Sequence, residues 1–272
     1  MRTIPIQAVA EKVSRAVQEV NFITPSVLMQ RLRDIHDHEP STVGQLAMID
    51  ILKNRAIAAE QSVPMCQDTG MILIFAEVGQ EIHFTGGSLT EAICDGVRQG
   101  CKEGFLRNSV VQEPLFERHN SRDNTPPVIH YELVPGDGLK LIVAAKGFGA
   151  ENMSCLVMLT PAQGITEVKR RVIQCVLEAG PNACPPIVVG VGVGGKMEKA
   201  ALLAKKALMR EMGQRHPDAR YARLEEELLS LVNATGVGPQ GWGGRNTAID
   251  VRVEYYPPHI AGSPLAINLD CH

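Results

Sequence analysis

Residues 186–212, PIVVGVGVGGKMEKAALLAKKALMREM, decide the fold class of this chain. The segment opens with a glycine-rich apolar run, which predicts a buried strand over Pro186–Gly195. An Ala/Leu/Lys-rich stretch follows, and the spacing of its apolar residues predicts a helix over Glu198–Met212. A strand that leads directly into a helix is typical of chains in which the two alternate, so the fold class is α/β or mixed α+β.

The same alternation extends in both directions along the chain. Apolar positions at helical spacing predict a helical segment over about residues 1–60, and a mixed sheet with covering helices after it. VIHYEL (128–133) and LKLIVAAKG (139–147) flank a Pro-Gly-Asp-Gly turn and predict a hairpin. We expect residues 1–272 to form a single domain. Further strands are predicted at Met71–Gly79, Ala248–Tyr256 and Leu265–Cys271, and further helices at Leu89–Gly104, Ile165–Ala179 and Tyr221–Asn233.

The composition narrows the class of protein. Hydrophobic residues make up 44% of the chain and charged residues 21%, with a net charge of -3. This balance lacks the basic surface that a nucleic-acid-binding protein needs. The longest apolar runs are too short to cross a membrane, and the charged N-terminal residues do not resemble a secretory signal. We therefore expect a cytoplasmic protein that binds neither nucleic acid nor membrane.

The seven cysteines divide into two groups by their sequence context. The odd number and the absence of an export signal argue against a disulfide framework. Four lie within predicted helices or apolar runs and are expected to be small buried side chains: Cys94, Cys101, Cys155 and Cys175. Three lie at junctions of loops and strands, where a thiolate can project into a cleft: Cys66, Cys184 and Cys271.

Three thiolates without a fourth have a definite chemical meaning. A cubane iron–sulfur cluster held by three cysteines has one iron without a protein ligand, and that iron can act as a Lewis acid. Dehydration needs such help because hydroxide is a poor leaving group. No CxxC pair is present, which argues against a finger-type zinc site. From spacing alone, a three-cysteine metal site and ordinary core thiols both stay open.

The glycine run GVGVGGK (190–196) allows three interpretations. It matches GxGxxG before a helix, but no acidic residue of a βαβ unit follows at the required position, and Met197 breaks the phosphate-loop pattern. Close packing of a strand on a helix is the first interpretation. Carboxylate or cluster surroundings and a nucleotide site are the other two.

Three polar residues are candidates for chemistry. Asp68 follows Cys66 by two residues and could serve as an acid or base, or could form a turn. Arg107 stands among apolar residues in FLRNSVV and could bind a carboxylate or lie on the surface. His259 follows two prolines and is one of eight histidines.

Taken together, the motifs resemble those of the α subunit of two-subunit class I fumarate hydratases, a family that includes L(+)-tartrate dehydratase. The resemblance extends from residue 64 to the end of the chain. It is carried by PMCQDTG (64–70), FLRNSVV (105–111), KGFGAENMSCLVML (146–159), NACPPIVVGVGVGGK (182–196), GVGPQGWGGRNTAIDV (236–251) and HIAGSPLAINLDCH (259–272).

The resemblance implies a role for eight residues. Cys66, Cys184 and Cys271 would hold a 4Fe-4S cluster with one iron not bound by protein. Asp68 would be the general acid that assists the departing hydroxyl group. The residues that would bind the substrate are Gln67, Arg107, Gly149 and His259.

The resemblance also implies a reaction and a partner. The chain would be a hydro-lyase subunit that hydrates fumarate to L-malate together with a β subunit, which supplies further basic residues and the catalytic base. An assembly of several α or αβ units is expected, with a small dicarboxylate as substrate. The form of residues 151–159 favours fumarate over L(+)-tartrate. An L(+)-tartrate dehydratase α subunit and a non-catalytic iron–sulfur or zinc-binding subunit stay open as alternatives.

Overall fold

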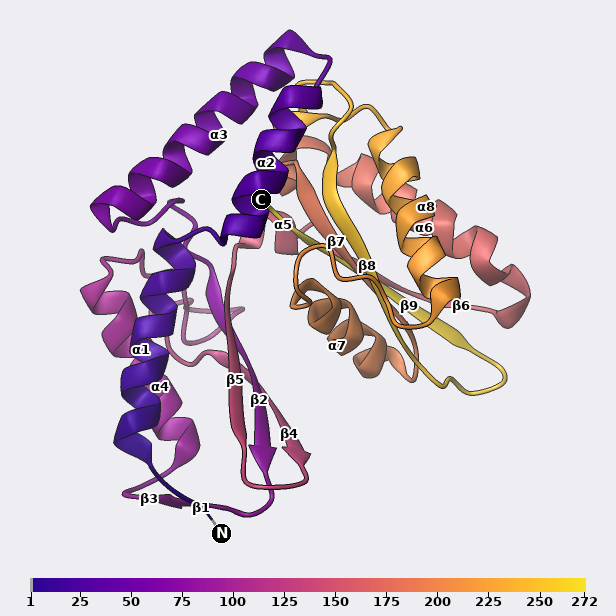
Figure 1. The fold of residues 1–272 in the computed structure, drawn as a ribbon. Helices are drawn as coiled ribbons and strands as arrows, with labels where there is room; N and C mark the ends of the chain where they lie inside the picture. Colours follow the sequence, from indigo (N-terminus) through magenta and orange to yellow (C-terminus); the bar gives the residue numbers. More distant parts are fainter. Residues whose placement is uncertain (1) are drawn as a thin grey trace. The chain divides into compact units, whose positions relative to one another are not determined.

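The computed structural model describes residues 2–272, which form two compact units (Figure 1). The first unit consists of residues 2–24 and 54–148, and the second unit of residues 25–53 and 149–272. Both contain helices and strands, which confirms the mixed α/β fold class. The assignment of the whole chain to one functional domain stays a prediction.

Three strands and two helices make up most of the first unit. β2 is the centre of a three-stranded sheet with order β4-β2-β5, in which β4 runs parallel and β5 antiparallel to β2. β1 and β3 form a separate parallel pair. The elements are β1 (Arg2–Pro5), α1 (Ile6–Phe22), β2 (Met71–Gly79), β3 (Ile82–Thr85), α4 (Leu89–Glu103), β4 (Val128–Val134) and β5 (Leu139–Lys146).

The predicted hairpin is wrong, although both of its strands exist. β4 and β5 do not pair with each other, because β2 lies between them. The turn between them crosses the end of β2, where the N–H groups of Gly79 and Glu81 donate to the carbonyls of Gly138 and Gly136 at 2.9 and 3.0 Å. The residues of β2 from Ile72 to Ala76 are all buried, so the central position satisfies the strand that has the most apolar surface.

Helices α1 and α4 pack closely because α4 has glycines on its inner face. A Cβ on Gly96 would lie 2.6 Å from the carbonyl oxygen of Ala10, and one on Gly100 would lie 2.6 Å from that of Ser14. Val13 and Val17 of α1 fill the adjoining space and join the core that includes Ile72 and Ile74 of β2.

The second unit contains a four-stranded sheet with order β6-β9-β7-β8. β7 and β8 are parallel, and β9 is antiparallel to both of its neighbours. Strand β6 was not predicted from the sequence. The elements are α2 (Ser26–His38), α3 (Thr42–Gln61, whose last residues belong to the first unit), α5 (Phe148–Glu151), β6 (Cys155–Leu159), α6 (Gly164–Ala179), β7 (Ile187–Gly194), α7 (Met197–Leu208), α8 (Ala219–Asn233), β8 (Ala248–Tyr256) and β9 (Ser263–Asp270).

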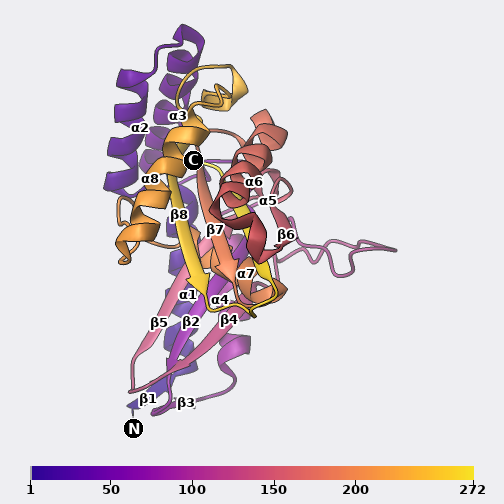
Figure 2. The same ribbon diagram turned by 90° about the vertical axis from the view of Figure 1, so that its right-hand side faces the viewer.

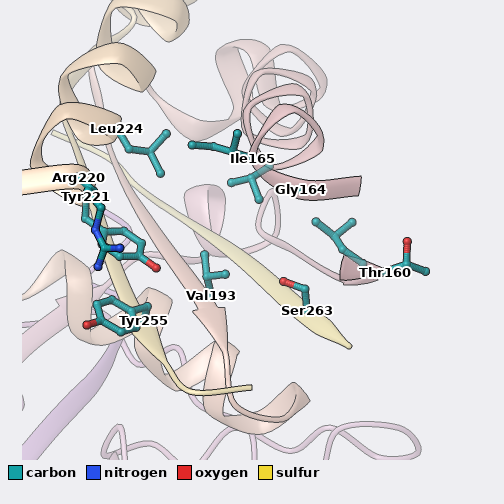
Figure 3. A pocket seen from close by; sticks show the side chains of 11 residues that line it. Thr160, Gly164, Ile165, Val193, Arg220, Tyr221, Leu224, Tyr255 and Ser263 are labelled. Atoms are coloured by element: carbon teal, nitrogen blue, oxygen red, sulfur yellow. The ribbon is translucent and has the colours of Figure 1, made fainter. Parts of the chain in front are cut away.

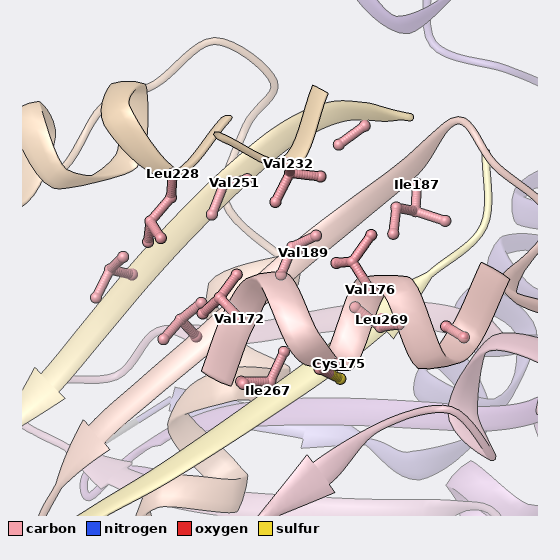
Figure 4. Packing of buried hydrophobic residues seen from close by; sticks show 14 of the residues in the cluster. Val172, Cys175, Val176, Ile187, Val189, Leu228, Val232, Val251, Ile267 and Leu269 are labelled. Carbon is pink, nitrogen blue, oxygen red and sulfur yellow. The ribbon is translucent and has the colours of Figure 1, made fainter. Parts of the chain in front are cut away.

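The two faces of β7 are covered in different ways (Figures 1 and 2). On one face, Val189 and Val191 join a core shared with α6 and α8, which Figure 4 shows in detail. On the other face, α7 lies directly against the backbone of β7. A Cβ on Gly190 would lie 2.2 Å from the carbonyl oxygen of Ala204. The glycine run therefore serves the close packing of strand and helix, the first of its three interpretations.

A buried carboxylate joins the α2–α3 connection to a distant loop. Glu39 accepts hydrogen bonds from the N–H groups of Ser41, Arg245 and Asn246 and from the Asn246 side chain, at 2.7–3.2 Å. Burial acts to raise the pKa of Glu39, but these hydrogen bonds outweigh it and the pKa is lowered. The ionised side chain thus holds the loop before β8 in place.

No helix within residues 2–272 combines the length and the apolar character that crossing a bilayer requires.

We predict that Gly192→Ala destabilises the second unit by about 1–3 kcal/mol, the cost of overpacking a core. The new Cβ would lie 2.1 Å from the carbonyl oxygen of Ala200, so α7 must move away from the sheet. Urea unfolding measures the loss. Gly138→Ala is the matched control because its Cβ would meet no atom within 4 Å, and an equal loss in both variants would contradict the prediction.

Candidate active site

The CQDTG loop lies in the first unit and is held by hydrogen bonds to its own backbone and to the end of β5. The Asp68 carboxyl group accepts from the N–H of Gly70 at 3.1 Å and from the N–H of Phe148 at 2.8 Å. The sulfur of Cys66 accepts from the Asp68 N–H at 3.4 Å. Cys66 and Gln67 are exposed and Asp68 is half-buried, so the loop presents all three side chains at the surface of a fixed turn.

Two glycines let this loop approach β5. Gly70 has a φ of +70°, and a Cβ on it would lie 2.5 Å from the carbonyl of Lys146. A Cβ on Gly147 would lie 3.2 Å from Oδ2 of Asp68. Larger residues at either position would push the carboxyl group away from the strand end.

Arg107 lies beside the CQDTG loop. Its carbonyl oxygen accepts a hydrogen bond from the hydroxyl of Thr69 at 3.2 Å and another from the side-chain amide of Asn124 at 3.0 Å. The Oδ1 atom of Asn124 accepts from the Ser109 N–H at 2.7 Å. Thr69 and Asn124 are buried, whereas the Arg107 side chain is exposed. The backbone is therefore fixed while the guanidinium group is available to a ligand.

Cys184 occupies a strained turn at the start of β7 in the second unit. Its φ of +53° is left-handed, a conformation that costs a non-glycine residue roughly 1–3 kcal/mol and that concentrates at functional sites. The Cys184 N–H donates to the carbonyl of Pro181 at 2.9 Å. The side chain is exposed.

Gln240 and His272 adjoin this turn, and neither was predicted from the sequence. Gln240 donates to the carbonyl of Pro185 from its backbone at 2.7 Å and from its side chain at 2.9 Å. The same amide nitrogen lies 3.1 Å from Nε2 of His272. The Gly-Pro-Gln-Gly run around Gln240 is a signal for a tight turn, but nothing in it indicated which loop the turn would contact.

Cys271 lies at the same end of the second unit's sheet as Cys184. Because β9 is antiparallel to β7, the last residue of β9, Asp270, pairs with Val188 near the start of β7. Gly149 joins them at this end, since a Cβ on it would lie 3.3 Å from the carbonyl oxygen of Asn182. Three of the predicted site residues are thus brought to one edge of the sheet by its topology.

The segment that carries Gly149 is fastened by Glu151. Its carboxylate pairs with the Lys205 ammonium group of α7 and accepts from the side-chain amide of Asn268 at 2.9 Å. The Ser154 hydroxyl accepts from the N–H of Leu269 at 3.0 Å. These contacts hold α5 against the end of β9.

The structure does not bring His259 together with Cys184, Gly149 and Cys271. His259 lies in the exposed loop between β8 and β9, at the other end of the sheet. The eight residues of β9 separate it from Cys271, a length of roughly 26 Å at about 3.3 Å per residue. Its substrate-binding role stays a prediction that rests on the resemblance.

The exposure of the cysteines agrees with their expected division at four of the seven positions. All seven are free thiols. Cys101 and Cys175 are buried, and Cys94 and Cys155 are half-buried. Burial raises the pKa of Cys101, and a hydrogen bond with Cys155, together with burial, raises that of Cys175. Cys66 and Cys184 are exposed, so their thiols are accessible to a ligand, whereas Cys271 is half-buried like Cys94 and Cys155. The role of Cys66, Cys184 and Cys271 as cluster ligands stays a prediction.

Within each unit's described residues, no group of three histidine, cysteine or acidic side chains is close enough to hold a metal ion. Cys66 belongs to the first unit, and Cys184 and Cys271 belong to the second.

A cavity of about 380 Å³ lies elsewhere in the second unit (Figure 3). Its walls are mostly apolar, with Ile165 and Leu224 among them, and two stacked tyrosines, Tyr221 and Tyr255, stand 4.5 Å apart at one side. None of the predicted site residues lines it.

Comparison with known proteins identifies the family. The family described as Fumarate hydratase (Fumerase) matches residues 10–272. A protein of Methanocaldococcus jannaschii, provisionally named L(+)-tartrate dehydratase subunit alpha, is 37% identical over 269 residues, which cover 97% of this chain and 94% of that protein.

This chain belongs to the fumarate hydratase family. Two further relatives named L(+)-tartrate dehydratase subunit alpha come from Escherichia coli strains UTI89 and K12. They are 29% and 28% identical to it over 270 residues, which cover 98% of this chain and 88% of each relative. The resemblance seen in the motifs is therefore confirmed, and membership extends over almost the full length of the chain.

The buried side-chain amide of Asn124 anchors the backbone of Arg107. We predict that Asn124→Ala lowers the free energy of unfolding by about 2–3 kcal/mol, because the buried Asn124 side chain loses two hydrogen bonds to the backbone of Arg107 and Ser109. Asn120→Ala is the matched control. Asn120 also makes two hydrogen bonds, to Asn108 and Arg122, but it is exposed and water can replace them. Equal losses in urea unfolding would contradict the prediction.

The thiols should differ in reactivity. We predict that Cys66 and Cys184 of the cluster-free chain react rapidly with iodoacetamide, whereas Cys101 and Cys175 react only after unfolding. Burial hinders access to both thiols; it also raises the pKa of Cys101, and the hydrogen bond with Cys155 together with burial raises the pKa of Cys175. Mass spectrometry of peptides after timed labelling measures the order. Fast modification of Cys101 in the folded chain would contradict it.

Proposed function

We propose that this chain is the α subunit of an iron–sulfur hydro-lyase that, with a β subunit, dehydrates L(+)-tartrate. The observation that supports the proposal is that hydrogen bonds and close backbone packing hold the predicted site residues in two places, one in each unit. Asp68 and Arg107 share one loop system in the first unit. Gly149, Cys184 and Cys271 share one end of the sheet in the second. In both places the backbone is held rigidly while thiol, carboxyl and guanidinium groups stay accessible.

The choice of tartrate follows the comparisons. The three relatives named above are all called L(+)-tartrate dehydratase subunit alpha, so they favour this alternative over the initial preference for fumarate. Fumarate hydration is the second candidate, since the matching family is described as fumarate hydratase and residues 151–159 resemble fumarase α chains. Both substrates are four-carbon dicarboxylates, and tartrate differs from malate by one hydroxyl group.

The three thiolates Cys66, Cys184 and Cys271 would hold a 4Fe-4S cluster. When bound, the cluster would supply an iron without a protein ligand as a Lewis acid for the substrate's hydroxyl group. The N–H group of Asp68, which already donates to the sulfur of Cys66, would stabilise that thiolate.

The chain's own side chains would orient the substrate and move one proton. Arg107 would bind a substrate carboxylate with its guanidinium group, and Gln67 would donate a hydrogen bond beside it. The backbone of Gly149 would lie against the substrate because no side chain intervenes. Asp68 would deliver a proton to the departing oxygen, with its carboxyl group oriented by the N–H groups of Gly70 and Phe148.

The dehydration balances as follows. L(+)-Tartrate loses a hydroxyl group from one central carbon and a proton from the other, which yields water and an enol that becomes oxaloacetate. Asp68 would act on the hydroxyl side, and the base that accepts the carbon-bound proton would come from the β subunit.

The test is activity of the α/β pair after anaerobic reconstitution with iron and sulfide. We predict a kcat/KM for L(+)-tartrate at least about tenfold above that for L-malate, because a site that hydrogen-bonds a hydroxyl group disfavours a substrate that lacks it. Asp68→Asn should lower kcat about 10²–10⁴-fold while the cluster's visible absorbance stays unchanged.

Cys66→Ala should abolish both that absorbance and turnover, and Cys94→Ala, on the half-buried face of α4, should alter neither. Turnover of malate alone would establish the fumarate alternative. A pair in which Cys66→Ala loses the cluster but not turnover would show that the cluster is not catalytic.

A further inference from the structure

Two cysteines that the proposed site does not use, Cys155 and Cys175, lie together in the second unit. Cys155 is the first residue of β6, and Cys175 belongs to α6. Cys155 is paired with Ile267 of β9, and directly opposite residues of two strands share one face of the sheet. Ile267 and Cys175 are members of one core cluster, against which Cys155 also packs (Figure 4). The register of the sheet therefore points the Cys155 side chain toward α6.

The two sulfur atoms are in contact. A hydrogen bond joins the thiols of Cys155 and Cys175. The Cys175 sulfur also lies 3.3 Å from the carbonyl oxygen of Met153, two residues before Cys155. Cys175 has one S–H, so it donates either to that carbonyl or to the Cys155 sulfur, and an ionised sulfur is the stronger acceptor. The Ser154 hydroxyl accepts from the N–H of Leu269 at 3.0 Å, which fixes the backbone between these contacts.

The two thiols differ in access and in acidity. Cys155 is half-buried on the edge strand β6, whereas Cys175 is 4% exposed. The hydrogen bond with Cys175 lowers the pKa of Cys155 and outweighs burial, which acts to raise it; of the charged residues on α6, Glu178 also acts to raise this pKa and Arg171 to lower it. The same hydrogen bond, together with burial, raises the pKa of Cys175. Cys155 is therefore the thiol that ionises and that a small oxidant reaches, while Cys175 keeps its proton beside it.

We propose that Cys155 and Cys175 are a site of reversible oxidation, at which hydrogen peroxide converts the two thiols into an intramolecular disulfide. The Cys155 thiolate attacks one peroxide oxygen, the O–O bond breaks, and hydroxide leaves and takes up the proton that Cys155 released. The Cys175 sulfur then attacks the Cys155 sulfenic acid, loses its proton and displaces a second water. The two sulfurs give up two electrons and the peroxide accepts them. The inference is independent of the proposed function, because neither cysteine takes part in it.

The test is mass spectrometry of the cluster-free chain after brief treatment with hydrogen peroxide, with the remaining thiols then alkylated by iodoacetamide in denaturant. Cleavage after glutamate separates the two cysteines, since residues 151, 167 and 178 are glutamates and bound the peptides 152–167 and 168–178. We predict that these two peptides are recovered as one cross-linked species, about 2 Da lighter than their sum, and that dithiothreitol separates them again.

Cys94 and Cys101 are the matched control within the same molecule, because one is half-buried and the other buried, like the proposed pair. They lie seven positions apart on α4, roughly 10 Å along the helix axis, which is beyond the roughly 7 Å between Cα atoms that a disulfide tolerates. Burial raises the pKa of both. Cys155 should therefore lose its free thiol at least about tenfold faster than Cys94.

Two variants test the order of the steps. Cys175→Ser should leave Cys155 as a sulfenic acid that dimedone traps, because the second thiol is missing. Cys155→Ser should leave Cys175 as a free thiol after the same treatment, because Cys175 is buried and protonated. In the unchanged chain, equal rates of oxidation at Cys155 and Cys94 would overturn the proposal. So would recovery of Cys155 mainly in a disulfide with a cysteine other than Cys175.

Discussion

The close approach of α7 to β7 is the constraint on which the second unit depends. Glycines at alternate positions of β7 leave no side chains on the face that α7 covers, so the helix packs on the backbone itself. The short distance between α7 and β7 allows Lys205 of α7 to form an ion pair with Glu151, and Glu151 also accepts a hydrogen bond from Asn268 of β9. The position of α5 and of Gly149 therefore follows from the absence of two Cβ atoms in the neighbouring strand.

The direction of each strand decides which residues meet. β9 is antiparallel to β7, so the last residues of β9 lie beside the first residues of β7. Cys271 therefore comes to the same end of the sheet as Cys184. The same rule places His259 at the far edge, because it precedes β9 rather than follows it. Cys184 and Cys271, 87 positions apart in sequence, come to the same end of the sheet, whereas His259 and Cys271, 12 positions apart, are separated by the length of β9.

Local patterns predicted most elements but not their pairing. The apolar run Met71–Gly79 and the alternating run Ala248–Tyr256 became β2 and β8 with the expected bounds. The hairpin failed because a turn between two adjacent segments does not reveal that a third strand will insert between them. β6 was missed because its five residues follow a helical turn and were interpreted as a core segment around Cys155. Pairing depends on contacts between distant segments, which periodicity does not record.

The sequence indicates candidate reactive residues but not the residues that support their loops. Cys66, Asp68 and Arg107 stood out because thiols, carboxyls and isolated guanidinium groups have recognisable chemistry. Thr69, Asn124 and Gln240 did not, since a polar residue that supports a loop looks like any other polar residue until its partner is known. Each of them binds a backbone carbonyl, so each fixes a loop without adding a reactive group. A substitution at any of these three positions would therefore move the candidate residues without removing any of the reactive groups in the proposed mechanism. Its effect on activity would show how much the reaction depends on the positions of those groups, separately from their chemical identity.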